Sequence, residues 1–223
     1  MATEVLKLVN LSFAYEKDNE IFSNINFSLF EGEILGILGP SGTGKSSLLR
    51  LITGLEKPSE GEIYYFGKEI SGKNKFVLPH KRGIGLVLQE KVLFPHLNSL
   101  ENVKFGIKGS KKERTEKALS FLKLLKAEKF SSSFPNSLSG GEQQRVAIAR
   151  TLAPEPKLVL LDEPFSSLDK NLREELRQET KELFRKTNTS CIIVTHDQED
   201  VEILCDKALE LEDGKMTELS FSS

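Results

Sequence analysis

Strand-like segments alternate with helix-like segments along the chain. Residues 6–13 and 25–29 alternate apolar and polar side chains, as strands with one buried face do. Residues 158–161 and 191–194 are apolar throughout, which is typical of strands buried on both faces of a parallel sheet. An amphipathic helical pattern over 172–184 lies between them. This alternation predicts an α/β fold with a mostly parallel sheet.

A different pattern occupies residues 90–137. Strands punctuated by glycine stop there, and residues 111–129 are highly charged. Their apolar side chains recur at helical spacing, at Ala118, Phe121, Leu122 and Leu125. We interpret 90–137 as a helical subdomain inserted into a single domain of residues 1–223. The core of that domain would comprise about 1–89 and 138–223.

Composition excludes several classes of protein. Lys and Arg number 31 and Asp and Glu 33, so the formal net charge is −2, which argues against bulk attraction to nucleic acid. The hydrophobic fraction of 38% is too high for a disordered tail. No segment offers the roughly 20 apolar residues that a membrane-spanning helix needs. The composition therefore predicts a globular chain that does not cross a bilayer. We expect no nucleic-acid partner, although the net charge leaves a local basic patch open.

A glycine-rich loop follows the apolar segment 33–38 and opens a helical pattern. Its residues fit the pattern G-x-x-x-x-G-K-S: Gly39, Pro40, Ser41, Gly42, Thr43, Gly44, Lys45 and Ser46. Backbone N–H groups in such a loop point inward at phosphate oxygens, and the following helix N-terminus adds partial positive charge. Lys45 could reach the β- and γ-phosphates, and the Ser46 hydroxyl could ligate Mg²⁺. The loop predicts a nucleotide phosphate site.

Two carboxylates, Asp162 and Glu163, come directly after the apolar strand 158–161. Ligands of open parallel sheets bind at the carboxyl ends of the strands. Asp162 is therefore placed to hold Mg²⁺, in our interpretation through water. Glu163 would face the γ-phosphate and orient or deprotonate the attacking water.

A second glycine-rich segment also precedes a helix. Ser139 and Glu142 form the S-x-x-E pattern of a capping box. A cap does not require Gly140 and Gly141, whereas close approach of backbone to an anion does. The segment predicts a second anion site.

Residues 138–145, LSGGEQQR, resemble the signature of ABC-type ATPases. The resemblance extends from residues 13–15 to 213–215 and has the motifs in the expected order. It implies a P-loop NTPase core of the ABC type with a mostly parallel sheet, an N-terminal antiparallel β subdomain and an inserted helical subdomain. It also implies ATP and Mg²⁺ as cofactors, and two copies stacked head to tail, with each ATP between one phosphate loop and the partner's signature.

The resemblance assigns roles to further residues. Tyr15 matches the aromatic that stacks on adenine, and Gln89 the glutamine that senses Mg²⁺ and water. Asp169 ends a loop that couples the two sites, and His196 matches the switch histidine at the γ-phosphate. The predicted catalytic residues are Lys45, Gln89, Glu163 and His196. The predicted metal ligands are Ser46, Gln89 and Asp162. The predicted nucleotide-binding residues are Tyr15, Gly39, Pro40, Ser41, Gly42, Thr43, Gly44, Lys45, Ser46, Ser47, Ser139, Gly140, Gly141, Glu142 and Asp169.

Residues 92–103 resemble importer ATPases for iron(III), polyamines, molybdate and sulfate, and residues 89–96 favour the iron(III) type. Phe94 and Leu97 would either line a groove for a membrane subunit or belong to the core. The resemblance implies separate permease subunits, an extracytoplasmic solute-binding protein, and a cytoplasmic position on the inner face of the membrane. Such importers commonly carry a C-terminal regulatory domain; because this chain ends at Ser223, we expect none.

Two other functions are compatible with a phosphate loop. A soluble regulatory ABC-type ATPase, uncoupled from transport, is the alternative to a transport motor; such proteins usually pair two cassettes or carry coiled-coil insertions, and neither is visible. An unrelated P-loop GTPase would need a base-reading motif such as N-K-x-D, which the sequence lacks. The sequence favours an ATPase that drives solute transport, with the regulatory ATPase left open.

Overall fold

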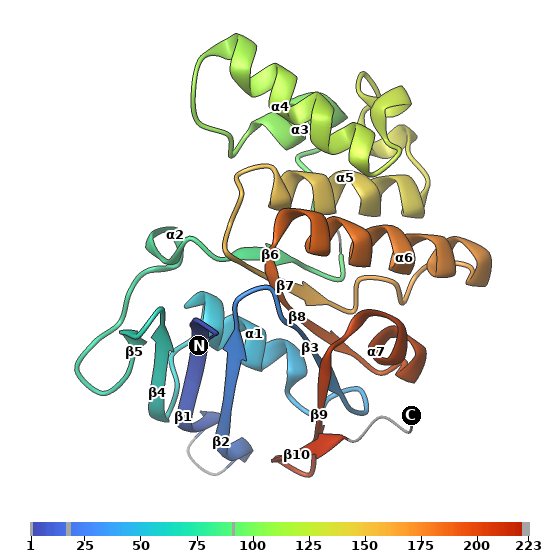
Figure 1. Ribbon diagram of the computed structural model, residues 1–223. Helices are drawn as coiled ribbons and strands as arrows, with labels where there is room; N and C mark the ends of the chain where they lie inside the picture. The colour runs from blue at the N-terminus through green and yellow to red at the C-terminus, as the bar shows by residue number, and fades with distance from the viewer. Residues whose placement is uncertain (1, 17–18, 91, 220–223) are drawn as a thin grey trace.

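The computed structural model describes residues 2–16, 19–90 and 92–219. Two sheets form the lower and central parts of the molecule, and helices cover the top and right (Figure 1). Lys91, which belongs to the importer-like run 89–96, lies outside the described residues. Within the described residues, no helix is both long and apolar enough to cross a bilayer.

The first sheet is antiparallel, as expected for the N-terminal part. Its order is β2-β1-β4-β5. The strands are β1 (Glu4–Glu16), β2 (Asn19–Phe30), β4 (Glu60–Tyr65) and β5 (Lys68–Ser71). Strand β1 is confirmed as half-buried: it alternates up to Leu8, and after a register irregularity between Leu8 and Leu11 it buries Leu11 and Phe13.

The second sheet has the order β10-β9-β3-β8-β7-β6 and is parallel except for the pair β9 and β10. Its strands are β3 (Ile34–Leu38), β6 (Gly85–Val87), β7 (Leu158–Asp162), β8 (Ser190–Thr195), β9 (Lys207–Glu212) and β10 (Lys215–Leu219). Every residue of β7 and β8 is buried. The continuous apolar runs are thus confirmed as strands covered on both faces, and with them the mostly parallel α/β fold.

Helices cover the two faces of this sheet. They are α1 (Lys45–Thr53), α2 (Pro79–Arg82), α3 (Ser99–Lys104), α4 (Lys111–Leu124), α5 (Gly140–Leu152), α6 (Lys170–Thr187) and α7 (Gln198–Leu204), with 3₁₀ turns at Glu128–Phe130 and Pro135–Ser137. Two apolar clusters result. Val159 and Leu161 of β7 face the cluster with α4, α5 and α6, while Leu158 and Leu160 face the one with α1 and the antiparallel sheet.

The segment between β6 and α5 is helical, as predicted. In Figure 1, α3 and α4 form the top of the molecule and lie on α5. Ala118, Phe121, Leu122 and Leu125 are buried there, which confirms the amphipathic pattern. They share one cluster with Val146 and neighbouring residues of α5, so α5 joins this segment to the sheet. The limits 90 and 137 stay a prediction.

Candidate functional site

The phosphate loop connects β3 to α1 and requires glycine at two positions for steric reasons. Gly44 has φ +96°, and a side chain there would lie 2.4 Å from Ile21. At Gly39, an added Cβ would lie 2.3 Å from the carbonyl oxygen of Leu211. Both positions exclude larger residues because the backbone passes close to β2 and β9. These two glycines thus allow the loop to pack against two other strands.

The side chain of Lys45 lies inside this loop. Its Nζ donates to the carbonyl oxygens of Gly39 and Pro40, at 2.7 Å each, and the residue is only 4% exposed. Burial lowers the pKa of Lys45, and the charges of Glu163 and Asp162 oppose that shift. A buried ammonium group among loop carbonyls is placed to meet an anion that enters the loop.

The predicted carboxylates lie beside the loop. Asp162 is the last residue of β7, and its Oδ1 accepts a hydrogen bond of 2.9 Å from the Ser46 hydroxyl. Burial raises the pKa of Asp162, and the hydrogen bond from Ser46 opposes that shift. A hydroxyl and a carboxylate therefore meet beside the phosphate loop.

Glu163 lies between two other predicted residues. Gln89 Nε2 donates to its Oε2 at 3.4 Å, and His196 Nδ1 lies 3.2 Å from its Oε1. Gln89, Glu163 and His196 follow β6, β7 and β8, so three adjacent parallel strands deliver them to one edge. The structure thus brings to Glu163 one residue 74 positions earlier in the sequence and one 33 positions later.

Glu163 has an unusual backbone conformation, with φ +43°. Its N–H donates to the carbonyl oxygen of Val194 at 2.9 Å, and its own carbonyl accepts from the Ser166 hydroxyl at 3.0 Å. A non-glycine residue with positive φ costs about 1–3 kcal/mol and persists only where the surroundings enforce it. In this conformation the Glu163 carboxylate lies 3.2 Å from His196 Nδ1.

Tyr15 lies beside the helix that the phosphate loop opens. Its hydroxyl shares a hydrogen bond of 3.0 Å with Ser47, and its ring packs edge-on against Phe13 at a centroid distance of 4.8 Å. The residue is 58% exposed. An aromatic ring held at one edge and open on its face can stack on a nucleobase.

The second glycine-rich segment begins α5 with the predicted capping box. Ser139 accepts from the N–H of Glu142, and Glu142 accepts from the N–H of Ser139 at 2.8 Å. Gly141, however, has a packing role that the sequence argument missed. A Cβ at this position would lie 2.2 Å from Leu172 of α6. This glycine therefore allows close contact of two helices, whereas Gly140 is exposed.

Gly141→Ala should destabilise the fold by at most about 1 kcal/mol, because the new methyl group overlaps a terminal methyl of Leu172, while alanine itself favours the helix. Adding Leu172→Ala should recover part of this loss, so the two changes are non-additive. Urea unfolding of both single variants and the double variant measures the coupling. Additive losses would show that the two side chains do not compete for the same space.

The signature segment and the phosphate loop are separate within one chain. No hydrogen bond or ion pair joins 139–142 to 39–47 in the described part of the chain, and α5 and α1 lie apart in Figure 1. Asp169, also predicted to bind nucleotide, caps α6 and accepts from the N–H of Leu172 at 3.1 Å. The structure therefore brings together the phosphate loop, the two carboxylates, Gln89 and His196. Residues 139–142 and Asp169 do not join them.

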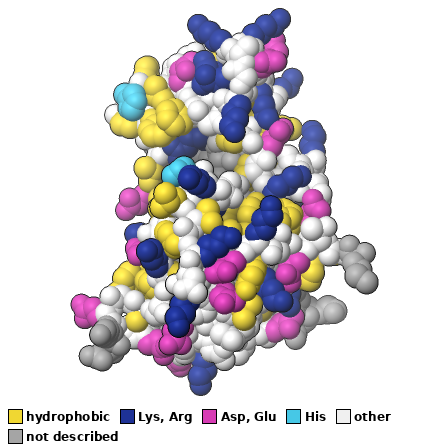
Figure 2. Space-filling view, turned by 90° about the vertical axis from the view of Figure 1, so that its left-hand side faces the viewer, with side chains coloured by type: hydrophobic (Ala, Val, Ile, Leu, Met, Phe, Trp, Pro, Cys, Tyr) yellow, Lys and Arg dark blue, Asp and Glu magenta, His cyan; other side chains and the backbone are white. Residues whose placement is uncertain are grey.

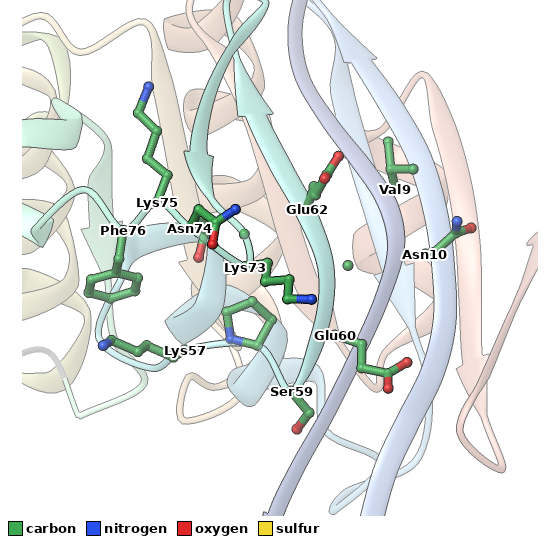
Figure 3. Close-up of a pocket in the computed structure, with 14 residues that line it drawn as sticks. Val9, Asn10, Lys57, Ser59, Glu60, Glu62, Lys73, Asn74, Lys75 and Phe76 are labelled. Atoms are coloured by element: carbon green, nitrogen blue, oxygen red, sulfur yellow. The ribbon is translucent and has the colours of Figure 1, made fainter.

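A groove of about 910 Å³ lies on the antiparallel sheet (Figure 3). It is lined by residues of β1 and β4 and by the loop 71–76, and none of the predicted site residues lines it. Lys57, Lys73 and Lys75 share it with Glu60 and Glu62, so charges of both signs line it. The chemistry of the chain is concentrated at the edge of the parallel sheet instead.

Comparison with known proteins decides the family. A family model described as ABC transporter matches residues 22–166. The chain belongs to the ABC transporter family. Among ABC relatives, an Fe(3+) ions import ATP-binding protein of Haemophilus influenzae is 42% identical over 218 residues, which are 96% of this chain and 61% of that protein. A probable sulfate/thiosulfate import ATP-binding protein of Chlorella vulgaris is 42% identical over 203 residues, covering 90% of this chain and 84% of that one.

Solved ABC structures have the same fold. A dimeric ATP-binding cassette in a post-hydrolysis state with bound ADP and Pi matches with a TM-score of 0.83 and 36% identity, over 97% of this chain and all of that one. These matches confirm the predicted ABC-type core with its antiparallel β subdomain and helical insertion. The chain spans 61% of the length of the Haemophilus iron(III) relative.

Proposed function

We propose that this ABC protein hydrolyses ATP with Mg²⁺ to power import of an inorganic ion or small solute through separate membrane-spanning subunits. One observation carries the proposal. Glu163 lies between Gln89 and His196, directly beside the Ser46–Asp162 pair and the phosphate loop. The names of the relatives, all import ATP-binding proteins, support the direction of transport.

In this proposal, each group of residues at the carboxyl-terminal edge of the parallel sheet has its own role. The N–H groups of residues 39–47 and Lys45 hold the phosphates, and Tyr15 stacks on adenine. Glu163 accepts a proton from the attacking water. His196 and Gln89 keep the carboxylate aligned with the γ-phosphate. Because the three residues are fixed by three strands of one sheet, little rearrangement is needed to align them.

Magnesium fits the donors that this site provides. Mg²⁺ prefers octahedral oxygen ligands and commonly uses one or two protein oxygens with phosphates and waters. Ser46 and Asp162 provide a hydroxyl and a carboxylate 2.9 Å apart, and Gln89 adds an amide oxygen nearby. No group of three or more His, Cys, Asp or Glu residues in the described chain could hold a metal alone. When bound, the ion would neutralise phosphate charge.

A second copy would complete each ATP site. Residues 139–142 begin α5 and lie apart from the phosphate loop, so they have no ATP to bind within their own chain. Placed head to tail, two copies would present Ser139, Gly140 and Asp169 to the partner's nucleotide. The dimeric arrangement of the solved relatives supports this assembly.

An exposed aromatic group is proposed to bind the membrane subunits. Phe94 packs against Phe105 at 4.7 Å and His96 at 6.0 Å, and Arg150 stacks over Phe94 at 5.2 Å. Phe105 is 63% exposed. Figure 2 shows the left-hand side of the molecule as drawn in Figure 1, and hydrophobic side chains gather beside a histidine on the upper part of that side. Exposed apolar groups of this kind mark interaction sites.

The chain would then lie on the cytoplasmic face of the membrane, with an extracytoplasmic solute-binding protein delivering the solute to the permease. The test is to purify a tagged chain from detergent-solubilised membranes of its own cells. Integral membrane subunits should co-purify, and Phe105→Glu should remove most of them because it places a charge in the contact. Phe30→Glu, at an exposed phenylalanine of β2, is the control. Recovery without any membrane subunit would favour a regulatory ATPase.

A further inference from the structure

We propose that Arg173 of α6 is a positioning residue that ties the Glu163 turn to the loop carrying His196. The proposal rests on the proposed ATPase function. Residues 169–177, which contain Arg173, resemble importer ATPases, but the sequence assigns this residue no role, and it belongs to neither glycine-rich segment. It stands out because one side chain contacts both loops that flank the Glu163–His196 pair.

The guanidinium group of Arg173 spans two loops. Its Nη1 donates to Asp197 Oδ2 at 2.9 Å, and its Nη2 donates to the carbonyl oxygens of Leu168 at 3.0 Å and Ser166 at 3.4 Å. The side chain is 27% exposed, so solvent screens these contacts only partly. A planar group with several fixed donors can reach partners on two different sides, whereas the three donors of a lysine all sit on one nitrogen atom.

Both contacted loops lead directly to the proposed catalytic pair. Asp197 follows His196, and its position is fixed further: its N–H donates to Thr195 Oγ1 at 3.0 Å and its Oδ1 accepts from Glu199 at 3.0 Å. On the other side, the Ser166 hydroxyl donates to the carbonyl oxygen of Glu163 at 3.0 Å. A shift of either loop would therefore change the 3.2 Å separation of Glu163 and His196.

Arg177, one turn further along α6, has a different task. It is 1% exposed and donates to Asp200 at 2.6 Å, to Asp197 at 2.7 Å and to Glu199 at 2.8 Å. Removing one partner of such a buried cluster leaves a charge unpaired and destabilises the fold. Arg177 therefore anchors α7 to α6, and Arg173 is the better residue for a test of positioning.

The first measurement compares the steady-state hydrolysis of Arg173→Ala, Arg173→Lys and the unaltered chain. Arg173→Ala should lower kcat by about tenfold with the KM for ATP changed less than about twofold, since the nucleotide contacts remain. The kcat of Arg173→Lys should lie between those of Arg173→Ala and the unaltered chain, because one ammonium group reaches only one loop. Arg185→Ala is the matched control: this arginine of α6 also joins a carboxylate, Asp206, and a backbone carbonyl, Gly32, at another place. Melting temperatures show whether each variant is folded.

The second measurement repeats Arg173→Ala in a His196→Ala background, in single turnovers with radiolabelled ATP. If Arg173 acts through His196, Arg173→Ala should lower the single-turnover rate in the His196→Ala background by less than about twofold. A full tenfold loss in both backgrounds, or an unchanged kcat for Arg173→Ala in an active enzyme, would overturn the positioning role alone. Absence of ATP hydrolysis by the unaltered chain would instead contradict the proposed function on which this inference rests.

Discussion

Glu163→Gln should lower the rate of ATP hydrolysis by about 10²–10⁴-fold, the usual contribution of a general base. The amide has nearly the same shape as the carboxylate but cannot accept the proton of the attacking water. Its oxygen and nitrogen can still meet Gln89 and His196, which now lie 3.4 and 3.2 Å from the carboxylate. Binding of ATP should therefore persist while turnover stops.

The same variant should accumulate as an ATP-bound dimer. If two copies enclose the nucleotide and hydrolysis opens them, a chain that binds but does not hydrolyse ATP stays closed. Gel filtration with and without ATP and Mg²⁺ measures this shift. Turnover and elution identical to those of the unaltered chain would refute the role of Glu163.

Glu155→Gln is a matched control for this experiment. Glu155 is also a glutamate with positive φ, at +58°, and it pairs with Lys117 at the surface, remote from the phosphate loop. Exposed ion pairs contribute little to stability. Its variant should hydrolyse ATP at close to the unaltered rate, which separates loss of the base from a change of backbone strain.

Lys45→Ala should lower turnover by about 10²–10³-fold, the effect of removing one preorganised donor from a developing charge. It should also weaken ATP binding, because the loop loses its one buried ammonium group. Nucleotide binding by calorimetry and phosphate release measure the two effects separately. An intact turnover number would count heavily against the assignment of the phosphate loop.

The melting temperature decides whether this loss is local. Lys45 donates to two carbonyl oxygens of its own loop, so the variant also leaves Gly39 and Pro40 without these partners. Lys112→Ala, at a largely exposed lysine of α4, is the control for loss of one positive charge. It should leave both binding and turnover unchanged.

Much of the fold was predictable because the signals were local. Residues 158–161 and 191–194 are apolar throughout, a length and composition typical of strands buried on both faces of a sheet. The capping box at Ser139 and Glu142 likewise needs only four consecutive residues. By contrast, the short strand β5 and helix α7 carry weak patterns and were not predicted.

The sequence by itself determined the chemical groups: a phosphate loop, two carboxylates after a buried strand, a capped glycine-rich helix start, and a histidine after another buried strand. The first three depend on neighbouring residues, so spacing along the chain was enough to find them. The histidine was assigned through the resemblance to ABC-type ATPases. The tertiary structure decided which groups meet. Only the order of β6, β7 and β8 brings Gln89 and His196 to Glu163. Only the packing of α5 on α6 explains Gly141, and only the approach of α6 to two loops gives Arg173 its contacts. These contacts join distant segments, and their geometry arises from the arrangement of strands and helices in space.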